Sequence, residues 1–97
     1  MKNTHSASIE TLYRAITLLG TPEECRDFLE DICTVKELED ISQRLTVAQL
    51  LKTGKSYQVI SKETGASTAT ISRVNRALVY GNGGYEAMLL KLEDTDS

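Results

Sequence analysis

The chain has 97 residues, of which 40% are hydrophobic and 26% charged, and its formal net charge at pH 7 is -3. That length suits one domain and is too short for two. No stretch approaches the roughly 18 consecutive apolar residues of a membrane span, and residues 1–8 lack the apolar run of a signal peptide. We therefore expect a cytoplasmic protein. Because the chain has no tryptophan and one phenylalanine, its core must be mainly aliphatic, and so small a core favours an oligomer.

Charge is unevenly distributed along the chain. Residues 1–43 sum to -5, residues 44–80 to +5 and residues 81–97 to -3. The middle block holds six basic side chains against one acidic side chain, Glu63. A basic stretch is typical of a nucleic-acid-binding surface, although a charged helix face is often merely solvated.

Metal binding and catalysis have little support in this sequence. Cys25 and Cys33 are eight positions apart, too far for a close pair of zinc ligands, and His5 is the only histidine. We expect two reduced cysteines, no metal and no cofactor. No Cys–His or Ser–His–Asp set is expected, because the single histidine, His5, belongs to a segment that we expect to be a loose N-terminus. The pair Glu23–Glu24 fits the first turn of a helix. The protein is not expected to be an enzyme.

Helix signals follow one another through the first half of the chain. Apolar residues at helical spacing from Ile9 to Leu19 predict a first helix that Gly20 ends. The segments Thr21-Pro22-Glu23-Glu24 and Thr34-Val35-Lys36-Glu37 each have the order of a capping box, so they predict the starts of a second and a third helix. Thr53-Gly54-Lys55 closes the third. The side chains expected to face inward are Cys25, Phe28, Leu29 and Ile32 on the second helix and Leu38, Ile41, Leu45, Ala48 and Leu51 on the third.

The second half of the chain predicts three more helices. Ser56 caps a short helix over about 57–64, and Ser67 caps another over about 68–80. Residues 82–84 predict a loop, residues 85–92 a last helix, and residues 93–97 a frayed tail. With no alternating apolar run to support a strand, the expected fold is all-α: one six-helix domain over residues 1–97. The inward side chains expected here are Val59 and Ile60, then Ile71, Val74 and Leu78, then Tyr85, Met88, Leu89 and Leu92.

The two helices around Gly65 predict a helix-turn-helix at about residues 56–80. Gly65 accepts a left-handed backbone, and Ser61 is small where the second helix must cross the first. Ile71 and Val74 supply apolar side chains that face the first helix. An ordinary helical hairpin can meet one of these conditions by chance, but all three together favour the helix-turn-helix.

The outer face of the second helix of this motif suits the major groove of DNA. Its first residues are short and uncharged, so the backbone can approach and hydroxyl groups can reach base edges. The helix N-terminus and Ser67 favour a nearby phosphate. The alternative is that these serines and threonines form only a solvated face. The residues expected at DNA are Tyr57, Gln58, Ser67, Thr68, Ala69, Thr70, Ser72, Arg73, Arg76, Lys55 and Lys62.

The chain resembles the Trp repressor family. SYQVISKETGASTATISRVNRAL is similar to the helix-turn-helix of that family, and TVKELEDISQRLTVAQLLKTGKS to the helix that precedes it, with one residue fewer in the loop before Ser56. Through CTVKELEDISQRL, GASTATISRVNRAL and YGNGGYE, the whole chain resembles the Trp-repressor-related YerC/YecD group. The resemblance implies an intertwined homodimer on double-stranded DNA. Its two recognition helices would lie about 34 Å apart on a palindromic operator.

The resemblance also implies a pocket for an effector, a small-molecule corepressor of unknown identity. The two arginines that hold tryptophan in the Trp repressor match Arg44 and Arg73, and a threonine that frames the pocket matches Thr34. Two residues depart from the family: Val74 replaces a glycine and would project toward the indole, and Ala77 replaces the serine that helps hold the amino group. We expect that L-tryptophan is not the effector. Arg44 and Arg73 could instead bind another small ligand, DNA phosphate or local carboxylates.

These observations predict a sequence-specific DNA-binding transcriptional regulator, a repressor by resemblance, that acts as a homodimer with an unknown effector. The alternative function is a protein-interaction module that keeps the helix-turn-helix as a scaffold. In that case the acidic N-terminal helices would bind a basic partner.

Overall fold

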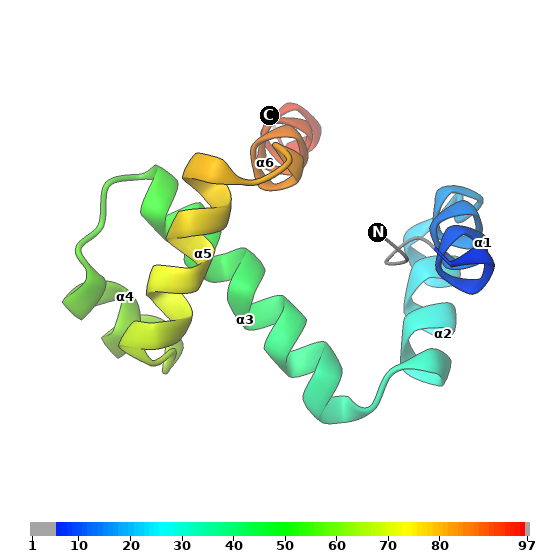
Figure 1. The fold of residues 1–97 in the computed structure, drawn as a ribbon, viewed down its shortest axis with the longest axis horizontal. Helices are drawn as coiled ribbons and strands as arrows, with labels where there is room; N and C mark the ends of the chain where they lie inside the picture. The colour runs from blue at the N-terminus through cyan, green and yellow to red at the C-terminus, as the bar shows by residue number, and fades with distance from the viewer. Residues whose placement is uncertain (1–5, 97) are drawn as a thin grey trace. The chain divides into compact units, whose positions relative to one another are not determined.

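The structure, a computed structural model, describes residues 6–96, so His5 lies outside the described residues. This part of the chain forms six helices and no strand, which confirms the all-α prediction (Figure 1). None of these helices is long and apolar enough to cross a membrane. The chain divides into two compact units, residues 1–38 and 39–97. The helices are α1 Ala7–Thr17, α2 Pro22–Ile32, α3 Val35–Lys52, α4 Tyr57–Thr64, α5 Thr68–Tyr80 and α6 Gly84–Asp96.

Helix α1 ends earlier than its apolar pattern predicts. The pattern extends to Leu19, but the helix ends at Thr17 with Leu18 as its C-cap. The amides of Leu18 and Leu19 bond three residues back, to Ala15 and Ile16, at 3.1 and 3.2 Å. Such bonds tighten the last turn, so the apolar spacing continues beyond the α-helical geometry.

The two predicted capping boxes differ in the structure. At the start of α3 the box is closed, because the Thr34 hydroxyl accepts from the Glu37 amide at 3.0 Å and the Glu37 carboxylate accepts from the Thr34 amide at 2.8 Å. At α2 the Thr21 hydroxyl accepts from the Glu24 amide at 3.1 Å. The Glu24 carboxylate, however, accepts from the Gly20 amide at 2.7 Å rather than from that of Thr21. Threonine caps both helices, but only Thr34 and Glu37 form a reciprocal box.

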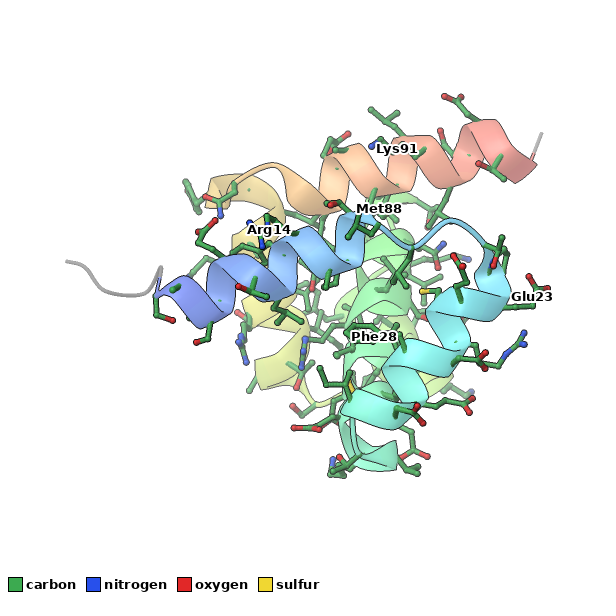
Figure 2. All side chains as sticks on the ribbon, turned by 90° about the vertical axis from the view of Figure 1, so that its right-hand side faces the viewer. Arg14, Glu23, Phe28, Met88 and Lys91 are labelled. Atoms are coloured by element: carbon green, nitrogen blue, oxygen red, sulfur yellow. The ribbon has the colours of Figure 1, made fainter. Side chains whose placement is uncertain are left out.

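The first unit has no buried residue among those described, 6–38. Cys25, Phe28 and Leu29 are only half-buried, and Ile32, predicted to be interior, is 53% exposed. Figure 2 shows Phe28 on α2 and Glu23 projecting from its first turn. Two short helices offer too little surface to bury each other's side chains. The apolar face predicted from the sequence is therefore present but stays partly exposed.

The second unit contains the core. Helix α5 packs on α4 and on α6. Ile41, Val59 and Met88 are predicted to be interior but are 48%, 39% and 49% exposed. Helical spacing places a residue on the apolar side of its helix, but a neighbouring helix must also cover that position. The buried residues are Val47, Ala48, Ile60, Ala66, Ile71, Val74 and Leu89.

The chain passes close to the end of α5 as it leads into α6. Gly81 follows α5, and a Cβ atom at that position would overlap the carbonyl oxygen of Ala77. Helix α6 begins at Gly84, within the predicted loop, and continues through residues 93–96, where the sequence suggested a frayed tail. The Thr95 hydroxyl bonds to the Lys91 carbonyl at 2.9 Å, which is a contact of the last helical turns.

Candidate nucleic-acid interface

The turn between α4 and α5 has the left-handed backbone expected of a helix-turn-helix. Gly65 has φ +77°, and its amide donates to the Ser61 carbonyl at 2.8 Å. The Ser61 hydroxyl donates to the Ala66 carbonyl at 2.8 Å, so Ser61 bonds across the turn in addition to being small. The Ala66 amide donates to the Thr64 hydroxyl at 3.1 Å. These bonds lie within six residues and fix the geometry at which α5 leaves α4.

Helix α5 has a buried inner face and an exposed outer face. Ile71 and Val74 are buried at 0% and 1% exposure, as predicted, and Leu78 is half-buried. The exposed positions follow the 3.6-residue period, so they occupy one side of the helix. Small uncharged side chains lie toward the N-terminus of this face and two arginines follow them. This outer face consists of Thr68, Ala69, Ser72, Arg73 and Arg76.

Ser67 and Thr70 bond to each other at the N-terminus of α5 and do not belong to its outer face. The Ser67 hydroxyl accepts from the Thr70 amide at 3.1 Å, which is the N-cap bond of α5. The two hydroxyl oxygens also lie 3.1 Å apart, and Thr70 is half-buried. The hydroxyl of Thr70 is therefore less available to a base edge than the sequence suggested, and the exposed hydroxyl groups near the N-terminus of α5 are those of Thr68 and Ser72.

Helix α4 contributes a second, smaller part of the interface. Gln58 and Lys62, one turn apart, are exposed, and Lys55 is exposed in the segment before the Ser56 cap. Tyr57, however, is half-buried and packs against the core, so its ring is partly occupied by structure. Its position at the first turn of α4 still places it beside the exposed residues.

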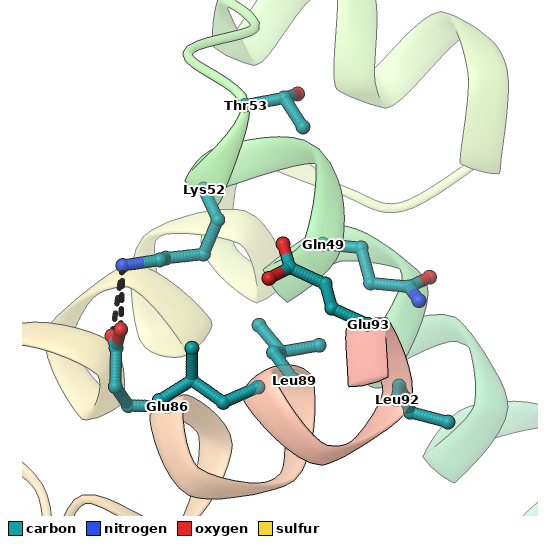
Figure 3. A pocket seen from close by; sticks show the side chains of 8 residues that line it. Gln49, Lys52, Thr53, Glu86, Leu89, Leu92 and Glu93 are labelled. Carbon is teal, nitrogen blue, oxygen red and sulfur yellow. Dashed lines mark hydrogen bonds and ion pairs between the residues drawn. The ribbon is translucent and has the colours of Figure 1, made fainter. Parts of the chain in front are cut away.

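The positive charge of this region is largely uncompensated. Among the described residues, no hydrogen bond or ion pair joins the side chain of Arg73, Arg76, Lys55 or Lys62 to a neighbour. Lys52 differs, because its Nζ lies 2.8 Å from a carboxylate oxygen of Glu86 on α6 (Figure 3). The cationic surface expected from the sequence is therefore carried by α4, α5 and the segment before α4, without Lys52.

The residues matched to an effector pocket are only partly brought together. A cavity of about 540 Å³ is lined by both Arg44 and Ala77, with Ile41, Leu45, Tyr85 and Met88 as its larger apolar walls. Arg73 and Val74 do not line it: Arg73 is exposed, and Val74 is buried in the core rather than projecting into this space. The hydroxyl of Thr34 is used to cap α3.

One contact beside this interface has no signal in the sequence. The Gln43 side chain on α3 donates from Nε2 to the Thr64 carbonyl at 3.2 Å. The two residues are 21 positions apart, and a polar residue on a long helix has many possible partners, so no local pattern could have indicated this pair. Among the described residues, no group of three or more histidine, cysteine or acidic side chains is placed where it could hold a metal ion.

Comparison with known proteins agrees with this geometry. The family model described as Trp repressor protein matches residues 7–93. The chain belongs to the Trp repressor family. It is 46% identical over 89 residues to the uncharacterized protein YerC of Bacillus subtilis, covering 92% of this chain and 86% of that protein. This confirms the resemblance drawn from residues 56–78 and places the chain in a family of DNA-binding regulators rather than enzymes.

Two solved structures of Trp-repressor-like proteins share the fold. A candidate Trp repressor from Staphylococcus aureus is 44% identical, with a TM-score of 0.88 over 96% of this chain and 95% of that one. A TrpR-like protein from Eubacterium eligens is 46% identical, with a TM-score of 0.86 over 91% of each chain. The six-helix arrangement is therefore that of the Trp repressor family.

Proposed function

We propose that this member of the Trp repressor family is a homodimeric transcriptional repressor that binds a specific DNA sequence through α5. The observation that carries the proposal is the outer face of α5. Short exposed side chains at its N-terminus would let the helix backbone enter the major groove, and Thr68 and Ser72 offer hydroxyl groups to base edges. Arg73 and Arg76 follow on the same face, and a phosphate would supply the partner that they lack.

The dimer is supported by the apolar face of the first unit. Leu12, Tyr13 and Ile16 on α1 are 37%, 50% and 44% exposed, and Leu18 after it is 82% exposed. Apolar surface of this extent on successive turns marks a site of association. A second copy is the occupant that a two-fold DNA-binding protein provides, since symmetric half-sites require two recognition helices.

An effector other than L-tryptophan fits the cavity between Arg44 and Ala77. The Arg44 guanidinium can bind a carboxylate, and the apolar walls suit an organic ring. Ala77 offers no side-chain polar atom to an amino group, and leaving a buried polar ligand group unpaired costs on the order of 1–3 kcal/mol. An amino acid is therefore disfavoured relative to a ligand without the ammonium group.

Selection of bound duplexes from random oligonucleotides tests DNA recognition directly. The purified chain is expected to enrich a palindrome whose half-sites are one helical turn apart. The selection is repeated with a mixture of amino acids, which should leave the selected sequence unchanged if the effector lacks an ammonium group. Recovery of no sequence above background at low salt would overturn the proposal. Stable co-purification of a protein partner, with function intact after Thr68→Ala and Ser72→Ala, would instead support the interaction-module alternative.

Arg73→Ala tests the contribution of α5 to that binding. The substitution is expected to weaken affinity for the selected duplex about tenfold and to reduce the slope of log affinity against log salt by about one, the value of one phosphate contact. Lys91→Ala, on α6, removes the same charge away from the interface and is the matched control. Equal effects from both variants would mean that net charge, and not the α5 face, governs binding.

A further inference from the structure

One polar contact links α3 to the turn of the helix-turn-helix. The Nε2 atom of Gln43 donates to the carbonyl oxygen of Thr64 at 3.2 Å, and both residues are half-buried. We propose that Gln43 is a positioning residue for DNA recognition, which holds the turn and therefore α5 in the orientation needed to read bases. The inference rests on the proposed function, because it takes α5 as the helix that enters the groove.

The Thr64 carbonyl needs a donor from outside its own helix. Thr64 is the last residue of α4, and the final carbonyls of a helix have no intrahelical partner. The groups around it are already used: the Gly65 amide bonds to Ser61, and the Thr64 hydroxyl donates to the Ile60 carbonyl at 2.7 Å and accepts from Ala66. A half-buried carbonyl without a partner is unfavourable, and Gln43 supplies that partner from α3.

The hydrogen bond from Gln43 to Thr64 constrains the orientation of the turn, which the apolar packing beside it does not. Ile60, Ile71 and Val74 anchor α4 and α5 through apolar packing, which is roughly proportional to area and has no preferred direction. A hydrogen bond weakens steeply when its angle departs from linear. Base contacts require α5 at a defined orientation, whereas flexible cationic side chains reach phosphates from many orientations. Loss of the Gln43 bond should therefore reduce sequence-specific binding more than non-specific binding.

The test compares two identical substitutions on one helix. Gln43→Met removes the donor while keeping an unbranched side chain of good helix propensity. Gln49→Met is the matched control, since Gln49 is exposed on α3 and the described part of the chain shows no hydrogen bond from its side chain. Affinities for the selected operator and for an unrelated duplex are measured at the same salt concentration. We expect the ratio of the two to fall about 3- to 10-fold for Gln43→Met, the range of one net hydrogen bond, and to stay at the wild-type value for Gln49→Met.

A second variant, Gln43→Glu, tests the same hydrogen bond independently. Gln43→Glu retains the side-chain length but sets a carboxylate against the Thr64 carbonyl, so the ratio should fall further than with methionine. A wild-type ratio in both variants would overturn the inference. An equal fall of both affinities, or loss of the helical circular-dichroism signal in both variants, would make Gln43 a structural residue and would overturn it as well.

Failure of the proposed function gives a different result. In that case the wild-type chain would not distinguish the operator from unrelated DNA, whatever residue 43 is. The contact is then tested by amide hydrogen exchange, in which Gly65 and Ala66 should exchange faster in Gln43→Met while Ile71 and Val74 keep wild-type rates. Unchanged exchange at Gly65 and Ala66 would overturn the role of Gln43 independently of DNA binding.

Discussion

The two units of this chain differ in how many of their apolar side chains they bury. Residues 39–97 enclose a core of seven buried residues from α3, α4, α5, α6 and the turn between α4 and α5. The described residues of the first unit, 6–38, have equally clear helix caps and an equally clear apolar pattern but bury no residue. Local signals are therefore sufficient to form a helix, whereas burial needs a surface that two short helices do not provide.

The largest expected effect comes from the core of the second unit. Ile71 is fully buried, so Ile71→Ala should lower the free energy of unfolding by about 2–5 kcal/mol, through lost burial and the cavity left behind. Chemical denaturation followed by circular dichroism measures this. Val79→Ala, on the same helix but 60% exposed, is the control and should change stability by less than about 1 kcal/mol. Equal losses would show that burial of Ile71 in the core does not stabilise the second unit.

The next effect tests whether a second copy covers the first unit. Ile16 is 44% exposed, and covering the remaining surface is worth about 1 kcal/mol per copy, counted twice in a two-fold dimer. Ile16→Ser should therefore raise the dimer dissociation constant about 30-fold, measured by sedimentation equilibrium. Thr11→Ser on the same helix should leave it unchanged. A wild-type chain that is monomeric at every concentration would mean that the face is covered by something else.

The smallest effect concerns the turn of the second unit. Gly65 has φ +77°, and apart from its chain neighbours no residue lies within 4 Å of the place that a Cβ atom would occupy. Gly65→Ala should therefore cost about 1–2 kcal/mol through backbone conformation alone. Gly84→Ala, also in open space but outside the left-handed region, should be neutral or slightly stabilising. Thermal unfolding of the two variants measures the difference. Equal stabilities would contradict the left-handed turn.

The turn and the basic surface of the candidate interface could be predicted from local sequence, but the contacts beside them could not. The spacing around Gly65 located the turn, and the basic block located the cationic surface, because both depend on residues that are neighbours in the chain. The pairing of Lys52 with Glu86 and of Gln43 with Thr64 joins residues 34 and 21 positions apart. Contacts of that range depend on how helices pack, which no local pattern specifies.

Local sequence was enough to specify the six helices, the left-handed turn and the caps at Ser56, Ser67, Thr21 and Thr34, because each depends on side chains and backbone within about four residues. Packing between helices determines which apolar positions are covered: Val74 lies in the core rather than in the cavity beside Arg44, and Ile32 lies on an open face. A side chain is buried only when another helix packs against it. Periodicity can therefore indicate the apolar face of a helix, but the tertiary structure decides whether that face is buried.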